Sequence, residues 1–452
     1  MIKRLPSIAA LLVAAYFAYL ASFAIHAHFA VDDPTNLGYY YRRGFATTLL
    51  DTARFWSTAY RPMGGLFYLP IYYLFHLNPL PYRIVILALI ASNIALTWRI
   101  AERLTESKAA PALASALMCG HAAMITIYLN TSMIYDVLTY FFTALMLAVY
   151  VGVRSRSREL TGMQTAIVIL AYIAAIDSKE IAVVAAGWVL AYEILIRSAR
   201  RWATPVALMA IGAIYTAGKM MGPHALAQDP GYRIEFTLHR YLLNNEIYWN
   251  SLFYSEYFQN SRRLLIEWGL LTLLCMLFRK REVWWCWFLV STATLAISFT
   301  VVPRDGAALY LPLLAWALLV SAMVASVPRH PASEWAAGWV IIVLIAGLWT
   351  ADTIHRWRDE WAPFLATQDL TWSVITQVRE LPRPAPGSRV MILSSPFNGW
   401  DAYFIAELAW NDRSIQIQMG DKSPQPPSAE ELKSFDWVLA FDRDILRVVR
   451  RP

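Results

Sequence analysis

Apolar runs of about the length needed to cross a bilayer recur along most of the first 350 residues or so. A transmembrane helix needs roughly 20 mainly apolar residues, because the hydrocarbon core is about 30 Å thick and backbone polar groups must be satisfied within it. Of the 452 residues, 58% are hydrophobic and only 16% are charged, against about 25% charged residues in soluble domains. The pattern predicts a polytopic α-helical membrane protein with about 11 transmembrane helices.

The basic residues fall in short clusters between these runs, although the net charge is +7. A single basic patch would indicate a nucleic-acid partner, whereas clusters between spans are typical of loops kept in the cytoplasm. No nucleic-acid partner is therefore expected. Lys3 and Arg4 predict a cytoplasmic N-terminus, and the first run, at about 8–30, is longer than a signal-peptide core. We predict that it is an uncleaved first span. Later inside clusters are expected at 154–158, 197–201, 279–281 and Arg329.

Polar and aromatic residues are densest at 26–62, directly after the first span. This stretch is predicted to form most of the first outer loop, 31–81. Within the loop, the apolar piece at 64–77 is short for a span, and we predict an amphipathic helix on the outer membrane surface. If this piece crossed the membrane, the later basic clusters would lie outside, against the positive-inside rule.

The chain changes character after about residue 352, where charge rises and proline recurs. We therefore divide it into a transmembrane region, 1–352, and a small extracytoplasmic α/β domain, 353–452. Predicted elements of this domain are buried strands at 389–393 and 437–441, an edge strand at 414–418, and helices at 402–410 and 430–435. The domain has no GxGxxG or P-loop motif, so no cofactor is assigned to it.

Ionisable residues from distant parts of the sequence meet at the outer ends of the spans in this topology. Such groups at membrane depth are costly, and by default they face a polar cavity. For any single one, an interfacial position or a local ion pair is an equally good explanation, so the prediction rests on the set. The set comprises Asp32, Asp33, Arg42, Arg43, Arg61, Asp136, Asp177, Lys179, Glu180 and Arg304. The candidate site residues chosen from it are Asp32, Asp33, Arg61, Asp136, Lys179, Glu180 and Arg304, with Tyr60 and Tyr135 beside them.

Asp32 and Asp33 follow the first span and precede Pro34. One carboxylate in this place could act as a general base toward an acceptor hydroxyl, and the two together could hold a divalent cation. The alternative is a turn or helix cap, because Asp-Pro commonly starts a turn.

Lys179 and Arg304 lie at the outer ends of predicted spans, and Arg61 precedes Pro62 in the first outer loop. Fixed cations in these places suit a phosphate whose lipid tail stays in the bilayer, since lysine supplies a point charge and arginine can bind phosphate oxygens bidentately. The alternative is pairing with the neighbouring acids Asp177, Glu180 or Asp305.

Four short motifs, in this order and on this side of the membrane, resemble the GT-C superfamily of integral-membrane glycosyltransferases. They are Val31-Asp32-Asp33-Pro34, Tyr60-Arg61-Pro62, Ile134-Tyr135-Asp136 and Asp177-Ser178-Lys179-Glu180. The superfamily includes protein O-mannosyltransferases and lipid A aminoarabinose transferases. The resemblance covers about residues 8 to 325, and this chain departs from it in having a short α/β tail in place of a large C-terminal module.

The resemblance implies transfer of a sugar from a polyprenyl-phosphate donor to a glycan, lipid or protein acceptor, on the outer face of a bacterial inner membrane. An aspartate of the first outer loop is then the catalytic base, with Asp33 favoured over Asp32. Lys179, Arg304 and Arg61 are the expected contacts of the donor phosphate. Expected to support the cavity are Asp136, Tyr135, Glu180 and Tyr60. The metal requirement stays open, with Asp32 and Asp33 as the ligands if there is one.

Two other classes of function fit parts of the sequence. A transporter or flippase of lipid-linked saccharide would also span the membrane many times. Transporters, however, usually carry their charged residues near the bilayer midplane on broken helices and often show paired halves, and no internal repeat is visible here. A third alternative is a scaffold without activity.

Overall fold

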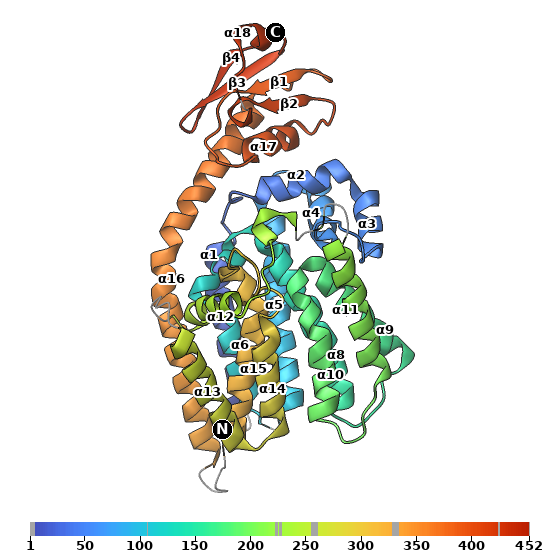
Figure 1. Cartoon of the computed structure of the whole chain (residues 1–452). Helices are drawn as coiled ribbons and strands as arrows, with labels where there is room; N and C mark the ends of the chain where they lie inside the picture. Colours follow the sequence, from blue (N-terminus) through green and yellow to red (C-terminus); the bar gives the residue numbers. More distant parts are fainter. Residues whose placement is uncertain are drawn as a thin grey trace.

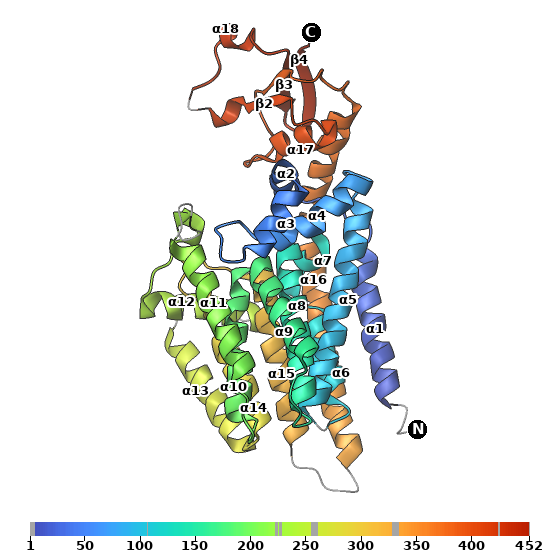
Figure 2. The same cartoon turned by 90° about the vertical axis from the view of Figure 1, so that its right-hand side faces the viewer.

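The computed structural model describes residues 5–105, 107–221, 225, 228–254, 261–327, 334–423 and 425–451. Lys3, Arg4 and Arg329, which the sequence placed inside, lie outside the described residues. Most helices stand side by side in one upright bundle, with the N-terminus at one end and a small domain with a β-sheet at the other (Figures 1 and 2). We call the end that carries this domain the domain end.

Most predicted spans coincide with one helix of the bundle each, but the third, at about 110–128, is broken after residue 119, and the helix of the ninth, at about 283–302, ends at residue 293. In chain order these helices are α1 (Leu5–Ala24), α5 (Pro79–Leu104), α6 (Ala110–Cys119), α8 (Ile134–Arg154), α9 (Gly162–Ser178), α10 (Ala185–Leu195), α11 (Ala203–Met221), α13 (Ser261–Phe278), α14 (Arg281–Ala293), α15 (Tyr310–Ser326) and α16 (Glu334–Glu380). Within the described residues, five helices are long and apolar enough to cross a membrane, or six if α6 and the segment Ala122–Leu129, bent by 59°, count as one span. The fold class is confirmed, and the number of crossings stays a prediction.

The first outer loop folds into three short helices at the domain end, α2 (Asp33–Arg43), α3 (Phe45–Ala53) and α4 (Pro62–Phe75). The apolar piece predicted as a surface helix is α4. Most of its residues are buried, and it packs against α3, α8 and α9. This helix is therefore an integral part of the protein, although its place relative to the membrane surface stays a prediction.

The small domain is an α/β unit, as predicted. Its sheet has the order β2-β1-β3-β4. The elements are β1 (Arg389–Ile392), α17 (Asp401–Trp410), β2 (Gln416–Met419), α18 (Ala429–Leu432), β3 (Trp437–Asp442) and β4 (Ile445–Arg450). Strand β1 is parallel to β2 and β3, and β4 runs antiparallel to β3. The predicted edge position of the second strand is confirmed, whereas β4 was not predicted.

Helix α16 joins the two parts of the protein (Figure 1). Its 47 residues run past the predicted end of the last span and continue to Glu380, where the helix packs against α17 and β4. The division between residues 352 and 353 therefore falls inside a continuous helix, and it stays a prediction.

A buried ion pair fastens the opposite end of the bundle. Arg154 of α8 donates from Nε and Nη2 to the Glu193 carboxylate of α10, at 2.7 and 2.9 Å. The Tyr150 hydroxyl and the Arg201 backbone N–H also donate to Glu193, both at 2.8 Å. Neither charged side chain is more than 2% exposed. Because the low-dielectric interior makes a lone charge very costly, each partner requires the other.

Glu193→Ala should therefore destabilise the protein strongly, by about 3–5 kcal/mol, because Arg154 would stay buried without its counter-charge. Thermal unfolding of the purified protein in detergent measures this. Glu267→Ala is the matched control, since Glu267 pairs with Arg263 in a partly exposed i,i+4 pair that is worth about 0.3–0.5 kcal/mol. Equal melting temperatures for the two variants would contradict the role assigned to the buried pair.

Candidate functional site

A cavity of about 600 Å³ opens among the helix ends at the domain end of the bundle. Eight of the nine residues singled out from the sequence line it: Asp32, Tyr60, Arg61, Tyr135, Asp136, Lys179, Glu180 and Arg304. They come from the first outer loop, the start of α8, the end of α9 and the loop before α15. An apolar part of the wall is formed by Ile234, Phe236, Leu295, Ile297 and Phe299. The cavity therefore suits a molecule that is partly charged and partly apolar.

Arg61 is held at the centre of the polar wall by several partners. Its Nη2 atom donates to Glu180 at 2.9 Å and to the Tyr232 hydroxyl at 3.0 Å, and its Nη1 atom donates to the Tyr60 hydroxyl at 2.7 Å. Burial alone would raise the pKa of Glu180, but the charge and hydrogen bonds of Arg61 hold that pKa below its usual value. Glu180 is thus a fixed counter-charge.

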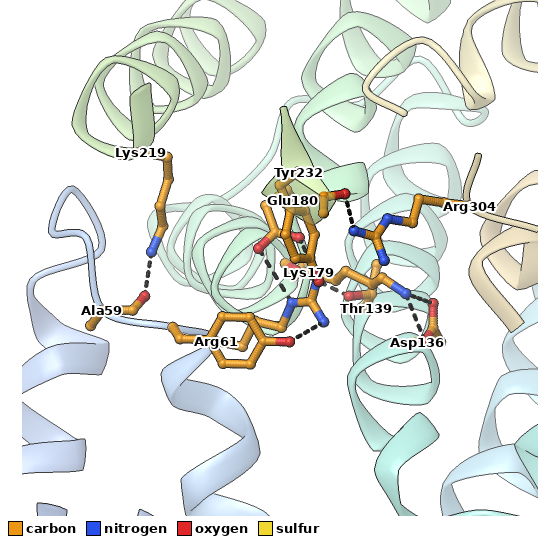
Figure 3. Close-up of polar contacts among 12 residues, drawn as sticks. Ala59, Arg61, Asp136, Thr139, Lys179, Glu180, Lys219, Tyr232 and Arg304 are labelled. Carbon is orange, nitrogen blue, oxygen red and sulfur yellow. Dashed lines mark hydrogen bonds and ion pairs between the residues drawn. The ribbon is translucent and has the colours of Figure 1, made fainter. Parts of the chain in front are cut away.

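Lys179 makes the second ion pair of the cavity. Its Nζ atom donates to both carboxylate oxygens of Asp136, at 2.7 and 2.9 Å (Figure 3). Lys179 follows the last residue of α9, and Asp136 lies in the first turn of α8. Lys179 is therefore in an ion pair, which was the alternative left open by the sequence. Its partner is Asp136 of α8 and not Asp177 or Glu180.

Arg304 differs from these two cations because it has no ion-pair partner in the described part of the chain. Its guanidinium donates to the Gly231 carbonyl and lies 4.0 Å from the centre of the Tyr232 ring. Its Nε atom is buried and has no hydrogen-bond partner among the described residues. A guanidinium with donors to spare is a natural contact for an anionic group.

Lys219 and Tyr232 are among the polar residues of the cavity that were not singled out in the sequence. Lys219, in the last turn of α11, donates to the Ala59 carbonyl, and Tyr232 contacts both Arg61 and Arg304. In the view of Figure 3, Arg61 and Tyr232 lie between Lys219 and Arg304. A lysine close to the outer end of a predicted span was a usable signal. Tyr232 is one of several tyrosines in a long predicted outer segment, and no sequence signal distinguished it from the others.

Aromatic side chains hold the first outer loop in register with α8. The Tyr40 hydroxyl donates to the Arg61 carbonyl at 2.8 Å, and the Tyr135 hydroxyl donates to Asn36 at 3.0 Å. A Cβ atom added to Gly64 would lie 2.3 Å from the Tyr135 ring. Glycine at this place therefore lets α4 come close enough to α8 for the loop to form one wall of the cavity.

The two adjacent aspartates have different surroundings. Asp33 is 1% exposed, and its Oδ2 atom accepts from the Ala30 backbone N–H at 2.8 Å. Burial raises the pKa of Asp33 to about 7, although the charge of Arg83 and the Ala30 hydrogen bond act in the opposite sense. Asp33 does not line the cavity, and its hydrogen bond closes the turn between α1 and α2.

Asp32 is exposed and lines the cavity. It is the N-cap residue of α2, but its carboxylate makes no capping hydrogen bond, and its backbone is left-handed, with φ 78°. Partial desolvation and then the neighbouring Asp401 carboxylate raise the pKa of Asp32. The sequence favoured Asp33 as the reactive carboxylate, and the geometry favours Asp32.

A metal site made by both aspartates stays a prediction. Within the described residues, no three histidine, cysteine, aspartate or glutamate side chains gather as a ligand set. The different surroundings of Asp32 and Asp33 do not favour a shared ion.

No protein-family model matches the sequence, and no curated protein matches it. Among solved structures, the chain is similar to ArnT from Cupriavidus metallidurans, crystallised with undecaprenyl phosphate. The TM-score is 0.53 and the identity 13%, and the match covers 91% of this chain and 85% of that chain. This likeness shows that the chain shares the fold of ArnT, in agreement with the fold that the sequence motifs led us to expect.

The buried place of Asp33 predicts a pH-dependent stability. Because its folded pKa, about 7, lies above the value of 3.8 for an exposed aspartate, Asp33 stabilises the fold below pH 4, and this contribution is lost as the pH rises through 7. Between pH 5.5 and 8.5, the melting temperature of Asp33→Asn should therefore fall less than that of the native protein. Asp359→Asn, at an exposed position of α16, is the control. Equal pH dependence in all three proteins would contradict the structural role of Asp33.

Proposed function

We propose that this protein is a membrane glycosyltransferase that moves a sugar from a polyprenyl-phosphate donor to an acceptor hydroxyl on the extracytoplasmic face. The observation that carries the proposal is a single cavity that combines the Asp32 carboxylate, which makes no capping hydrogen bond, the Arg304 guanidinium, which has no ion-pair partner among the described residues, and an apolar wall. The fold of ArnT, crystallised with undecaprenyl phosphate, supports a lipid-phosphate-linked sugar as the donor.

The donor phosphate is assigned to Arg304, with Lys179 and Arg61 as secondary contacts. Arg304 has donors free among the described residues, whereas Lys179 and Arg61 share their charge with Asp136 and Glu180. The apolar wall at Phe236, Leu295 and Phe299 suits the first part of the polyprenyl chain. Arg61, Lys179, Lys219 and Arg304 face the three carboxylates Asp32, Asp136 and Glu180, so the cavity carries a small excess of positive charge that favours an anion.

The transfer step uses Asp32 as the general base. Its carboxylate takes the proton of the acceptor hydroxyl while the acceptor oxygen forms a bond to the anomeric carbon of the sugar. The bond from that carbon to the phosphate oxygen breaks, and its electron pair leaves with the polyprenyl phosphate. Arg304 stabilises the charge that grows on this leaving group. The raised pKa of Asp32 makes it a stronger base than an ordinary aspartate, although a smaller fraction of it is deprotonated at low pH.

The position of the charges argues against the transporter alternative. Asp32, Lys179 and Arg304 lie at one end of the bundle, at helix ends or in loops, whereas transporter sites are usually near the bilayer midplane. An enzyme that meets its acceptor at the membrane surface needs its reactive groups at such an end.

Asp32→Asn should lower kcat about 100-fold or more, because a positioned general base typically contributes a factor of 10² to 10⁴. Asp33→Asn is the matched control: it changes the neighbouring carboxylate in the same way, and we expect it to retain most of the activity. The assay follows release of polyprenyl phosphate and labelling of an acceptor by the purified protein in detergent. Undecaprenyl phosphate binding confirms that each variant keeps its cavity. Full activity in Asp32→Asn would sink the proposed mechanism.

Arg304→Ala should weaken binding of undecaprenyl phosphate by about 10- to 100-fold, because a charge-assisted hydrogen bond contributes about 1.5–3 kcal/mol. Lys179→Ala should weaken it less, since Lys179 is already paired with Asp136, and should affect donor binding more than acceptor binding. Arg263→Ala, in the partly exposed pair with Glu267, controls for the loss of an arginine. An unchanged donor affinity in Arg304→Ala would contradict this role and would mean that Arg304 only holds Tyr232 in place.

A further inference from the structure

The C-terminal domain contacts the backbone of the proposed catalytic residue. Asp401, the first residue of α17, accepts from the Asp32 backbone N–H and from the Thr35 hydroxyl, both at 3.0 Å and both on Oδ1. Asp401 is 1% exposed. Hydrogen bonds that a buried carboxylate accepts are directional and stronger than those between neutral groups. One oxygen from the small domain thus fixes the first turn of α2, although the two segments are 369 residues apart in the sequence.

The backbone of Asp32 needs such a partner. Its φ of 78° is in the left-handed region, which is disfavoured for residues other than glycine. Aspartate at a helix N-cap normally turns its carboxylate back onto the helix N–H groups, but no capping hydrogen bond is made here. The left-handed turn thus leaves the carboxylate free for the cavity, and Asp401 holds the N–H of the same residue.

The rest of α17 makes this contact rigid. Arg42 of α2 donates from Nε to both oxygens of Glu407 at 2.9 Å, and Tyr41 donates to Asn411 at 3.0 Å. A Cβ atom on Gly38 would lie 2.1 Å from the Phe404 ring, so the two helices pack as closely as a glycine allows. The small domain is therefore docked on α2 by contacts that continue along both helices from the Asp401 hydrogen bonds.

We propose that Asp401 is a positioning residue, through which the C-terminal domain holds Asp32 in the backbone conformation that directs its carboxylate into the cavity. This inference rests on the proposed function for the role of Asp32, but the contact itself does not depend on it. Asp401 does not line the cavity among the described residues, so it acts through Asp32. The small domain thereby becomes part of the working site.

Two substitutions of Asp401 separate its hydrogen bonds from its charge. Asp401→Ala removes the acceptor, so we expect kcat to fall about 10- to 100-fold, as for other misplaced catalytic groups, while the affinity for undecaprenyl phosphate changes less than about twofold. Asp401→Asn keeps an oxygen that can accept both hydrogen bonds, and it should restore most of kcat. Because the Asp401 charge raises the pKa of Asp32, the acid limb of the pH–rate profile should move to lower pH in Asp401→Asn. The charged groups that line the cavity are unchanged in this variant.

Glu407→Gln is the control for a general weakening of the interface. It removes the charge that pairs with Arg42 but leaves the contact to Asp32 intact, so kcat should stay close to native. Parallel losses of kcat and melting temperature in Asp401→Ala and Glu407→Gln would overturn the proposal, since both residues would then serve stability alone. Full activity in Asp401→Ala would overturn it as well.

Hydrogen–deuterium exchange tests the contact without reference to activity. In Asp401→Ala, amides of residues 32–36 should exchange faster than in the native protein and in Glu407→Gln. Faster exchange in a protein that transfers no sugar would refute the proposed function and leave the positioning role standing. Unchanged exchange at these residues would refute the positioning role, whatever reaction the protein catalyses.

Discussion

Compensation of buried charge organises the domain end of the bundle. Arg61 with Glu180 and Lys179 with Asp136 are pairs between different elements, and each requires its partner because a lone charge in a low-dielectric surrounding is costly. These pairs hold the first outer loop, α8 and the end of α9 together. Once they are made, Arg304 is left without a counter-charge in the described part of the chain. The same constraint that builds the cavity therefore also marks the place where an anion would complete it.

Much of this arrangement could be predicted from the sequence. The length of the apolar runs predicted where helices lie, and the basic clusters predicted which helix ends share one side. Residues as distant as Asp32, Lys179 and Arg304 were assigned to one cavity on this basis, and they line one cavity in the structure. A bilayer leaves few ways to arrange long apolar helices. The number of spans therefore determines which helix ends, and which side chains, lie on the same side.

Other features depend on contacts that no local pattern encodes. Asp32 and Asp33 are adjacent and chemically identical, and their roles differ only through a left-handed backbone and a turn closed by Ala30. Strand β4 is mostly exposed, and its sequence ILRVVR does not alternate apolar and polar residues, so it lacks the period-2 pattern that marks a half-buried strand. Helix α16 continues beyond the last apolar run because its later turns pack against α17 and β4. Such partners become visible only in three dimensions.

The contact between Asp401 and Asp32 changes how the small domain should be regarded. A domain tethered only by α16 would tilt with that helix, and its position would have little effect on the cavity. Here α17 also packs on α2, with Glu407 on Arg42 and the Phe404 ring against Gly38. Because α2 starts at the residue after Asp32, any displacement of α17 would be passed directly to the proposed base. An acceptor that binds the outer surface of the small domain and displaces α17 would thus also displace the Asp32 carboxylate, through Asp401 and the first turn of α2.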